Sequence, residues 1–207
     1  MGTSMRCTVS IICRLIFGGA LIVSLIAAAG GQDREATRRE WGNLANGRTE
    51  YEVSDPALLP STLSLAAEEA GCRYKDDMKD APARFMRPEG RRIAIVFCSA
   101  ITGSHQIFDV SNVMKPTLIE LPIIAHPDGF RSTPRPGWIT WDREAKVFLA
   151  ESGSDISLAK LRHVYRMESG SGSFVIVRVQ FNPRIDGKDE WMTIWEAPRW
   201  SFPTTPN

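Results

Sequence analysis

One stretch of sequence decides the fold: Arg91-Arg92-Ile93-Ala94-Ile95-Val96-Phe97-Cys98. It contains six consecutive apolar residues that end in a cysteine, and turn-forming residues bound it at 88–90 and 99–104. The run is too short for the repeating pattern of a helix and is rich in β-branched and aromatic residues. Those features indicate a strand with both faces covered. We therefore place this strand at the centre of the domain.

Cys98 closes this strand and indicates a disulfide with Cys72. The two other cysteines, Cys7 and Cys13, lie in an N-terminal segment that we expect to be removed. Two cysteines in an exported protein most simply form one disulfide. Closing a loop of about 27 residues contributes roughly 3–4 kcal/mol in the chain-entropy model. A pair of free buried thiols is the alternative, and a metal site is disfavoured because no His or third Cys is near in sequence.

Residues 1–29 predict a secretory signal peptide. Arg6 and Arg14 provide its positive charge, residues 15–29 are uncharged and mostly apolar, and small residues surround Ala29. This pattern favours cleavage after Ala29 or nearby, and it predicts a periplasmic or secreted protein. An uncleaved membrane anchor is the alternative, although spanning a bilayer needs roughly 20 apolar residues.

Residues 30–60 predict a flexible linker. The first part of this segment is dense in charge, so it cannot bury enough surface to offset the entropy of ordering, although Trp41 is a candidate for local docking. A partly helical stretch before Trp41 is the alternative for this segment. The best-defined helix is expected at 61–71. Ser61 is its expected N-cap, and Gly71 is its expected stop.

The chain from 61 to 200 predicts a mainly β domain, and residues 201–207 predict a tail. After Arg91, apolar residues alternate with polar ones and turn signals recur, which is typical of antiparallel hairpins. Residues 126–137 contain three prolines and predict a long loop. The expected strands are 92–98, 106–110, 117–125, 137–141, 146–151, 161–167, 174–181 and 191–196. About eight strands with one short N-terminal helix indicate an antiparallel sandwich or a curved sheet.

The hairpin around residues 168–173 permits a prediction of register. Pairing Met167 with Val175 and His163 with Val179 collects one apolar set on a single face, whereas a slip of one residue mixes the two sets. The face expected to point inward holds Leu161, His163, Tyr165, Met167, Val175, Val177, Val179 and Phe181. The face expected to point outward holds Arg162, Val164, Arg166, Ile176, Arg178 and Gln180.

The charge balance and the motifs narrow the class of function. The chain has 25 Lys and Arg residues against 24 Asp and Glu residues, so it has no basic excess, and no nucleic-acid-binding motif is present. It contains no phosphate loop, dinucleotide fingerprint or nucleophile elbow. Ser157-Leu158-Ala159-Lys160 matches the Ser-x-x-Lys pattern of penicillin-recognising enzymes, but the partner motifs of that family are missing. We therefore expect no cofactor, no nucleic-acid partner and a non-enzymatic protein.

The histidines carry the enzymatic alternative, a small periplasmic hydrolase that uses His163 or His126. His163 lies on the inward face of a strand, a position more typical of a hydrogen-bonded core residue than of a ligand or base. His105 is expected at the surface. A hydrolase needs a Ser or carboxylate within about 3 Å of the imidazole. No two histidines have the spacing of metal ligands on one element.

Two tryptophans near the C-terminus are the candidate binding residues. In a regular strand, Trp191 and Trp195 point to one face with Thr193 between them, which suits a stacking platform for sugar rings or a hydrophobic partner. The alternative is that both indoles close the core. The outward arginines are candidates for binding an anionic polymer, with a solvated face as the alternative: Arg162, Arg166 and Arg178.

The strand segment Leu161-Arg162-His163-Val164-Tyr165-Arg166 and the Trp-rich end at 191–200 resemble exported proteobacterial proteins of unknown function. Those proteins share a signal peptide, a cysteine beside a short helix and a second cysteine that closes a strand. They also share the Arg-x-x-Tyr-Arg strand and the Trp-rich C-terminus. The resemblance covers about residues 72–200, and it implies a bacterial envelope setting without any catalytic residue.

The leading hypothesis is therefore a non-enzymatic exported β-domain that binds an envelope polymer or another protein. One alternative is the hydrolase described above. The other is a structural envelope protein that contacts the membrane only through an uncleaved N-terminal segment.

Overall fold

The computed structural model describes residues 33–98, 103–125, 127–153, 159–184 and 190–198. The predicted signal peptide and C-terminal tail lie outside these residues. The described chain is mainly β, as predicted, with antiparallel strands in open sheets. The described residues form twelve strands where about eight were expected, because short strands also form in segments predicted as loops or linker and the expected strand at 117–125 is divided into two.

Two five-stranded sheets and one hairpin contain these strands. The first sheet has the order β1 (Tyr51–Val53), β2 (Ala83–Met86), β3 (Ile93–Cys98), β4 (Ser104–Asp109) and β5 (Thr117–Ile119). The second has the order β12 (Met192–Glu196), β11 (Phe174–Asn182), β10 (Lys160–Met167), β9 (Val147–Gly153) and β8 (Trp138–Asp142). The hairpin pairs β6 (Leu121–Ala125) with β7 (Gly129–Thr133).

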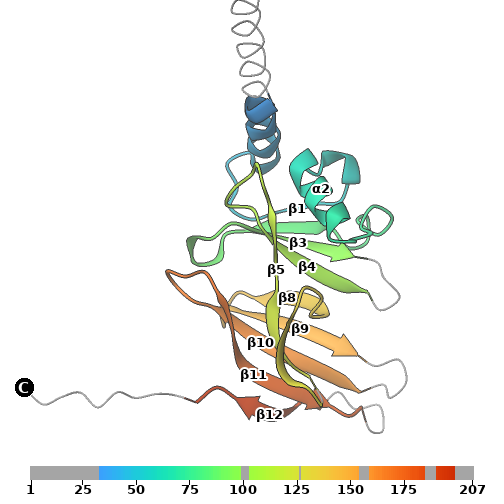
Figure 1. The fold of residues 1–207 in the computed structure, drawn as a ribbon, viewed down its shortest axis with the longest axis vertical. Coiled ribbons are helices and arrows are strands. Elements are labelled where there is room, and N and C mark those ends of the chain that lie inside the picture. Colours follow the sequence, from blue (N-terminus) through green and yellow to red (C-terminus); the bar gives the residue numbers. More distant parts are fainter. Residues whose placement is uncertain (1–32, 99–102, 126, 154–158, 185–189, 199–207) are drawn as a thin grey trace, which may run out of the picture.

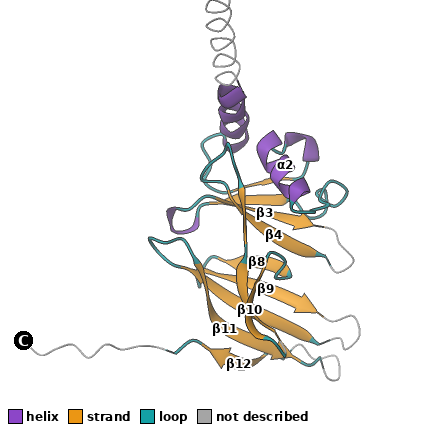
Figure 2. Ribbon diagram, in the orientation of Figure 1, coloured by secondary structure: helices purple, strands orange, loops and turns teal. Residues whose placement is uncertain are grey.

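The molecule is built in layers, with the first sheet between a helical layer and the second sheet (Figure 1). The helical layer contains a helix at residues 33–45 and α2 (Ser61–Glu69) (Figure 2). Short 3₁₀ turns lie at η1 (Pro56–Leu58) and η2 (Pro88–Gly90). Two hydrophobic cores result, one on each face of the first sheet.

Strand β3 is covered on both faces, as its apolar run predicts. Ala94 and Val96 point into the core beneath the helices, whereas Ile93 and Ile95 point into the core between the sheets. All four side chains are fully buried. Because successive side chains of a strand point to opposite faces, only a continuous apolar run suits a strand between two cores.

The predicted disulfide between Cys72 and Cys98 is confirmed, with a Cα–Cα distance of 4.8 Å. Gly71 immediately precedes Cys72 and has φ +69°, the left-handed conformation expected of a helix stop. The disulfide therefore joins the end of α2 to the end of the central strand.

The helix α2 is confirmed, but its expected N-cap is wrong. Ser61 is the first helical residue, and the side chain of the preceding Pro60 makes no capping hydrogen bond. Instead, Glu40 Oε2 accepts hydrogen bonds from the Ser61 backbone N–H at 3.2 Å and the Ser61 hydroxyl at 2.8 Å. A carboxylate from the other helix thus performs the capping role, and sequence-local rules do not detect it.

The flexible linker expected at 30–60 requires correction over its described part. Residues 33–45 form a helix, and β1 joins the edge of the first sheet. Trp41 is buried in the core beneath the helices together with Val53 and Leu59. A few large apolar side chains therefore order a segment whose average composition is highly charged.

The register of the β10–β11 hairpin is only half as predicted. His163 pairs with Val179, as expected, but the register shifts between Val164 and Tyr165. Beyond this bulge, Phe174 and Ile176 take the buried positions that were expected for Val175 and Val177. The residue inserted in β11 reverses which of its side chains face inward, which is the physical effect of a β-bulge, whereas Tyr165 and Met167 of β10 face inward as predicted.

The long loop expected at 126–137 contains strand β7. Gly129, the first residue of β7, has φ +76°, and Pro122 lies in a two-stranded hairpin, where the lack of an N–H is tolerated. The three prolines of this segment indicated a loop, and the alternation of residues 129–133 was too weak a signal to indicate the short strand.

Candidate functional site

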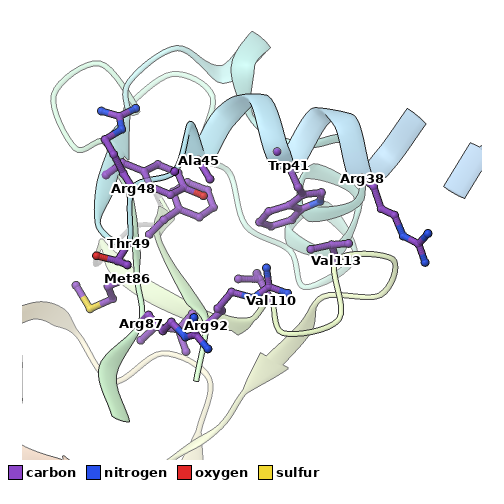
Figure 3. Close-up of a pocket in the computed structure, with 15 residues that line it drawn as sticks. Arg38, Trp41, Ala45, Arg48, Thr49, Met86, Arg87, Arg92, Val110 and Val113 are labelled. Atoms are coloured by element: carbon purple, nitrogen blue, oxygen red, sulfur yellow. The ribbon is translucent and has the colours of Figure 1, made fainter. Parts of the chain in front are cut away.

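A pocket of about 530 Å³ lies between the helix at 33–45 and the first sheet. Figure 3 shows its lining residues, which come from the helix, β1, the ends of β2 and β3, and the loop after β4. The lining residues are Arg38, Trp41, Gly42, Ala45, Gly47, Arg48, Thr49, Tyr51, Phe85, Met86, Arg87, Arg92, Ile93, Val110 and Val113. Its volume falls in the range typical of small-molecule sites.

The charge in this pocket has one sign. Arg38, Arg48, Arg87 and Arg92 line it, and none of the fifteen lining residues is Asp or Glu. In Figure 3, Arg38 and Arg48 extend at opposite ends of the pocket, while Arg87 and Arg92 lie together on the side of the sheet. We call these four side chains the arginine frame.

Three of the four arginines of the frame contact neutral groups. Arg92 donates a hydrogen bond to the Ser111 carbonyl oxygen at 2.8 Å, and Arg87 donates one to the Gly90 carbonyl oxygen at 3.1 Å. The guanidinium of Arg48 lies 5.6 Å from the centre of the Tyr51 ring. Among the described residues, none of the four arginines is in an ion pair. Because no described carboxylate neutralises these arginines, their positive charge is available to a ligand.

Aromatic side chains form a rigid wall of the pocket. Tyr51 stacks on Phe85 with ring centres 4.8 Å apart, and Trp41 packs edge-on against Phe85 at 6.0 Å. The indole N–H of Trp41 donates to the Thr62 hydroxyl at 3.1 Å, which in turn donates to the Val113 carbonyl at 2.8 Å. This chain of contacts fixes the wall before any ligand arrives.

The arginine frame also acts on the phenol of Tyr51. Burial raises the pKa of Tyr51 above its ordinary value, and the charges of Arg92 and Arg48 oppose that rise. The phenol therefore stays protonated at neutral pH and can donate a hydrogen bond. An O–H donor and guanidinium groups together offer a ligand donors and positive charge, a combination that suits anions.

The two tryptophans expected to form a platform lie on opposite faces of the second sheet. The register between β11 and β12 shifts after Val179, which pairs with Trp195. Trp195 packs against the core between the sheets and meets Phe130 edge-on at 5.8 Å. Trp191 lies beneath the guanidinium of Arg162, which is 3.7 Å from its ring centre. A second bulge thus separates side chains that a regular strand would place together.

Two of the three arginines predicted to face outward are paired with carboxylates of neighbouring strands. Arg162 donates twice to Glu151 Oε1, at 2.9 and 2.6 Å, and Arg178 pairs with Glu196 at 3.1 Å. Arg166 is exposed on the same strand as Arg162. The structure therefore brings together only Arg162 and Trp191 of the five predicted binding residues.

The histidines do not form a catalytic arrangement within the described chain. His163 is buried, and its Nε2 accepts a hydrogen bond from the Ile124 N–H at 3.0 Å. His105 is also buried, contrary to the expected surface position, and its Nδ1 accepts from the Ile139 N–H at 2.9 Å. His126 lies outside the described residues. In both buried imidazoles, a backbone amide occupies the nitrogen that a general base would use.

The described residues contain no cluster of three or more His, Cys, Asp or Glu side chains able to hold a metal ion. No helix among them is long and apolar enough to cross a membrane. Comparison with known proteins found no matching family, no matching curated protein and no matching solved structure.

Sequence reasoning missed the arginine frame. Its members are separated by up to 54 positions and belong to different elements, so no local motif contains them. The only sequence signal is that arginines recur between 34 and 48 beside Trp41. The same density of charge instead favours a linker, which is the expectation given for residues 30–60.

Proposed function

We propose that this protein is an exported, non-enzymatic binding module of the bacterial envelope that holds an anionic ligand in the arginine frame. One observation carries the proposal: four arginines surround a pocket of about 530 Å³ that has no carboxylate in its lining. Elsewhere in the described chain some arginines are paired with acids, as Arg91 is with Asp109 at 2.7 Å, whereas no ion pair engages the four arginines around this pocket. An unbalanced group of four around a cavity is suited to recognition.

The arrangement of the frame favours a ligand with several negative groups. Arg38 and Arg48 lie at opposite ends of the pocket, so a single small anion cannot contact both (Figure 3). Guanidinium groups bind phosphate and carboxylate oxygens in a bidentate manner, and their attraction is stronger beside apolar walls, where the effective dielectric constant is lower. A segment of an anionic envelope polymer has this chemistry.

Export is supported by the signal-like N-terminal sequence, the disulfide and the resemblance to exported proteobacterial proteins. A disulfide persists in an oxidising compartment such as the periplasm. Mass spectrometry of the protein recovered from the cell envelope tests this part. A mature chain that begins near Gly30 is expected, whereas a chain retaining residues 1–29 would favour the membrane-anchored alternative.

The binding experiment uses isothermal titration calorimetry with tripolyphosphate, a soluble polyanion. The wild-type protein is expected to bind it, and the affinity should fall at least about tenfold in an Arg48→Ala, Arg92→Ala double variant. The matched control is Arg131→Ala, which removes an exposed arginine paired with Asp128 on the distant β7 hairpin and should leave the affinity unchanged.

Three results would overturn the proposal. One is a wild-type protein that binds tripolyphosphate no more tightly than it binds chloride. Another is an equal loss of affinity in the Arg131→Ala control, which would indicate a general charge effect. The third is binding that survives only below about 50 mM salt, since exposed charges are screened far more than partly buried ones. An envelope-polysaccharide pull-down with the same variants then identifies the natural ligand.

A further inference from the structure

A second pocket, of about 610 Å³, lies at the other end of β3, where the two sheets meet. Its lining includes Phe97, Arg135, Trp138, Glu151, Ser152 and Lys160. It shares no residue with the pocket of the arginine frame. Its lining combines exposed aromatic surface with both hydrogen-bond donors and acceptors, whereas the arginine frame offers mainly donors.

Trp138 is the central feature of this pocket. It is 47% exposed, although it is a large apolar side chain held within a sheet. Its ring lies 5.3 Å from the ring of Phe97 and 4.6 Å from the ring of His105. An indole that is fixed by two ring neighbours and still half open to solvent presents a rigid apolar surface at low entropic cost.

The support behind Trp138 is rigid as well. The backbone N–H of the neighbouring Ile139 donates to His105 Nδ1 at 2.9 Å. The backbone N–H of His105 donates to the Gly137 carbonyl at 2.9 Å. The Gly137 N–H in turn donates to the Ser104 hydroxyl at 3.1 Å. These bonds lock the start of β8 to β4, so the indole keeps its place without a ligand.

Polar groups surround the indole on the pocket side. Glu151 receives both of its Arg162 hydrogen bonds on Oε1. Among the described residues, no hydrogen bond reaches its Oε2, which leaves that oxygen as an acceptor. Arg135 and Lys160 supply charged donors, and the Ser152 hydroxyl can donate or accept. Opposite charges are both present, so a neutral polar ligand fits better here than an anion.

We infer that this pocket binds a pyranose ring of a β-linked saccharide. A pyranose with equatorial hydroxyls has a flat C–H face that packs on an indole, while its hydroxyl groups, each a donor and an acceptor, project from the ring edge. Trp138 supplies the face, and Glu151, Ser152, Arg135 and Lys160 surround the edge. Neither Trp191, which lies beneath Arg162, nor Trp195, which packs against the core, offers this combination.

The test measures binding of two probes, the β-linked tetramer of N-acetylglucosamine and cellotetraose, by calorimetry on the intact protein. Wild type is expected to bind at least one of them. Trp138→Ala should weaken that binding about tenfold or more, and Trp138→Tyr should retain part of it, because a ring remains. Phe130→Ala is the matched control, because it removes an exposed aromatic side chain that does not line this pocket, and it should bind as wild type does.

Three results would overturn the inference: no binding of either saccharide at millimolar concentration, equal affinity in wild type and Trp138→Ala, or a loss in Phe130→Ala as large as that in Trp138→Ala. A thermal melt of each variant identifies unfolding, and Trp138→Tyr then decides the case if Trp138→Ala does not fold. The Arg48→Ala, Arg92→Ala variant should bind the saccharide normally, which separates this site from the arginine frame.

Discussion

At the scale of single residues, the buried histidines show how the fold accommodates polar groups. Burial, reinforced by the charge of Arg84, lowers the pKa of His105 to about 3. Burial also lowers the pKa of His163. Both imidazoles are therefore neutral at physiological pH and serve as hydrogen-bond acceptors for backbone amides.

The lowered pKa of His105 predicts a pH dependence of stability. Its folded-state pKa lies below the unfolded value near 6.5, so the unfolded chain binds more protons between those values. The stabilisation is complete above pH 6.5 and is lost as the pH falls toward 3. His105→Asn keeps an acceptor for Ile139 and should flatten the dependence by roughly 1 kcal/mol per pH unit between pH 6 and 4.

Urea unfolding of the wild type and the variant at several pH values measures this difference. Carboxylates also titrate in this range, but their contribution is common to both proteins and cancels in the comparison. Parallel pH profiles for the two proteins would show that His105 is not held neutral by the fold.

Gly137 gives a second prediction at the residue scale. Its φ is +111°, and a Cβ at this position would overlap the carbonyl oxygen of Glu151. Gly137→Ala should therefore lower the free energy of unfolding by roughly 3 kcal/mol or more. Gly153→Ala is the matched control from the same sheet, because a Cβ there meets nothing within 4 Å. Equal effects of the two substitutions in denaturant unfolding would contradict the steric argument.

At the scale of elements, the disulfide joins the end of α2 to the central strand β3 and thereby connects two layers. Replacing both cysteines by serine should lower the free energy of unfolding by roughly 3–4 kcal/mol, since a loop of 26 residues is released in the unfolded chain. Thermal and denaturant unfolding measure the effect. A double variant with the melting temperature of the wild type would show that packing alone holds these elements together.

The elements also show where prediction of register fails. Alternation of apolar residues located β10 and β11 correctly, and it predicted the pairs before the bulge at Val164. Beyond the bulge, it correctly predicted Tyr165 and Met167 of β10 as inward but predicted the wrong inward residues of β11. A second bulge separated Trp191 from Trp195. A bulge depends on how the sheet must twist against its neighbours, and the alternation of one strand contains no information about that requirement.

At the scale of the whole molecule, the pocket of the arginine frame exists only because the helical layer packs on the first sheet. A ligand that binds there stabilises the folded protein, by about 2.7 kcal/mol when its free concentration is a hundred times the dissociation constant. Tripolyphosphate should therefore raise the melting temperature of the wild type. The rise should be absent in the Arg48→Ala, Arg92→Ala variant, and a rise of equal size in that variant would place the anion elsewhere.

The sequence by itself determined the strand class, the central position of β3 and the pairing of Cys72 with Cys98. Each of these follows from local information, namely a continuous apolar run, the period of alternation and the number of available cysteines. Helix α2 and its stop at Gly71 were predicted for the same reason.

Only the tertiary structure decided what the candidate sites are. The arginine frame gathers residues from a segment that composition marked as linker and from the turn between β2 and β3. Trp138 is an exposed indole among the described residues, whereas the predicted pair is not available: Trp195 packs against the core after a bulge, and Arg162 stacks on Trp191. Binding surfaces arise from contacts between distant elements, and the periodicity of a single element does not encode which distant element it will meet.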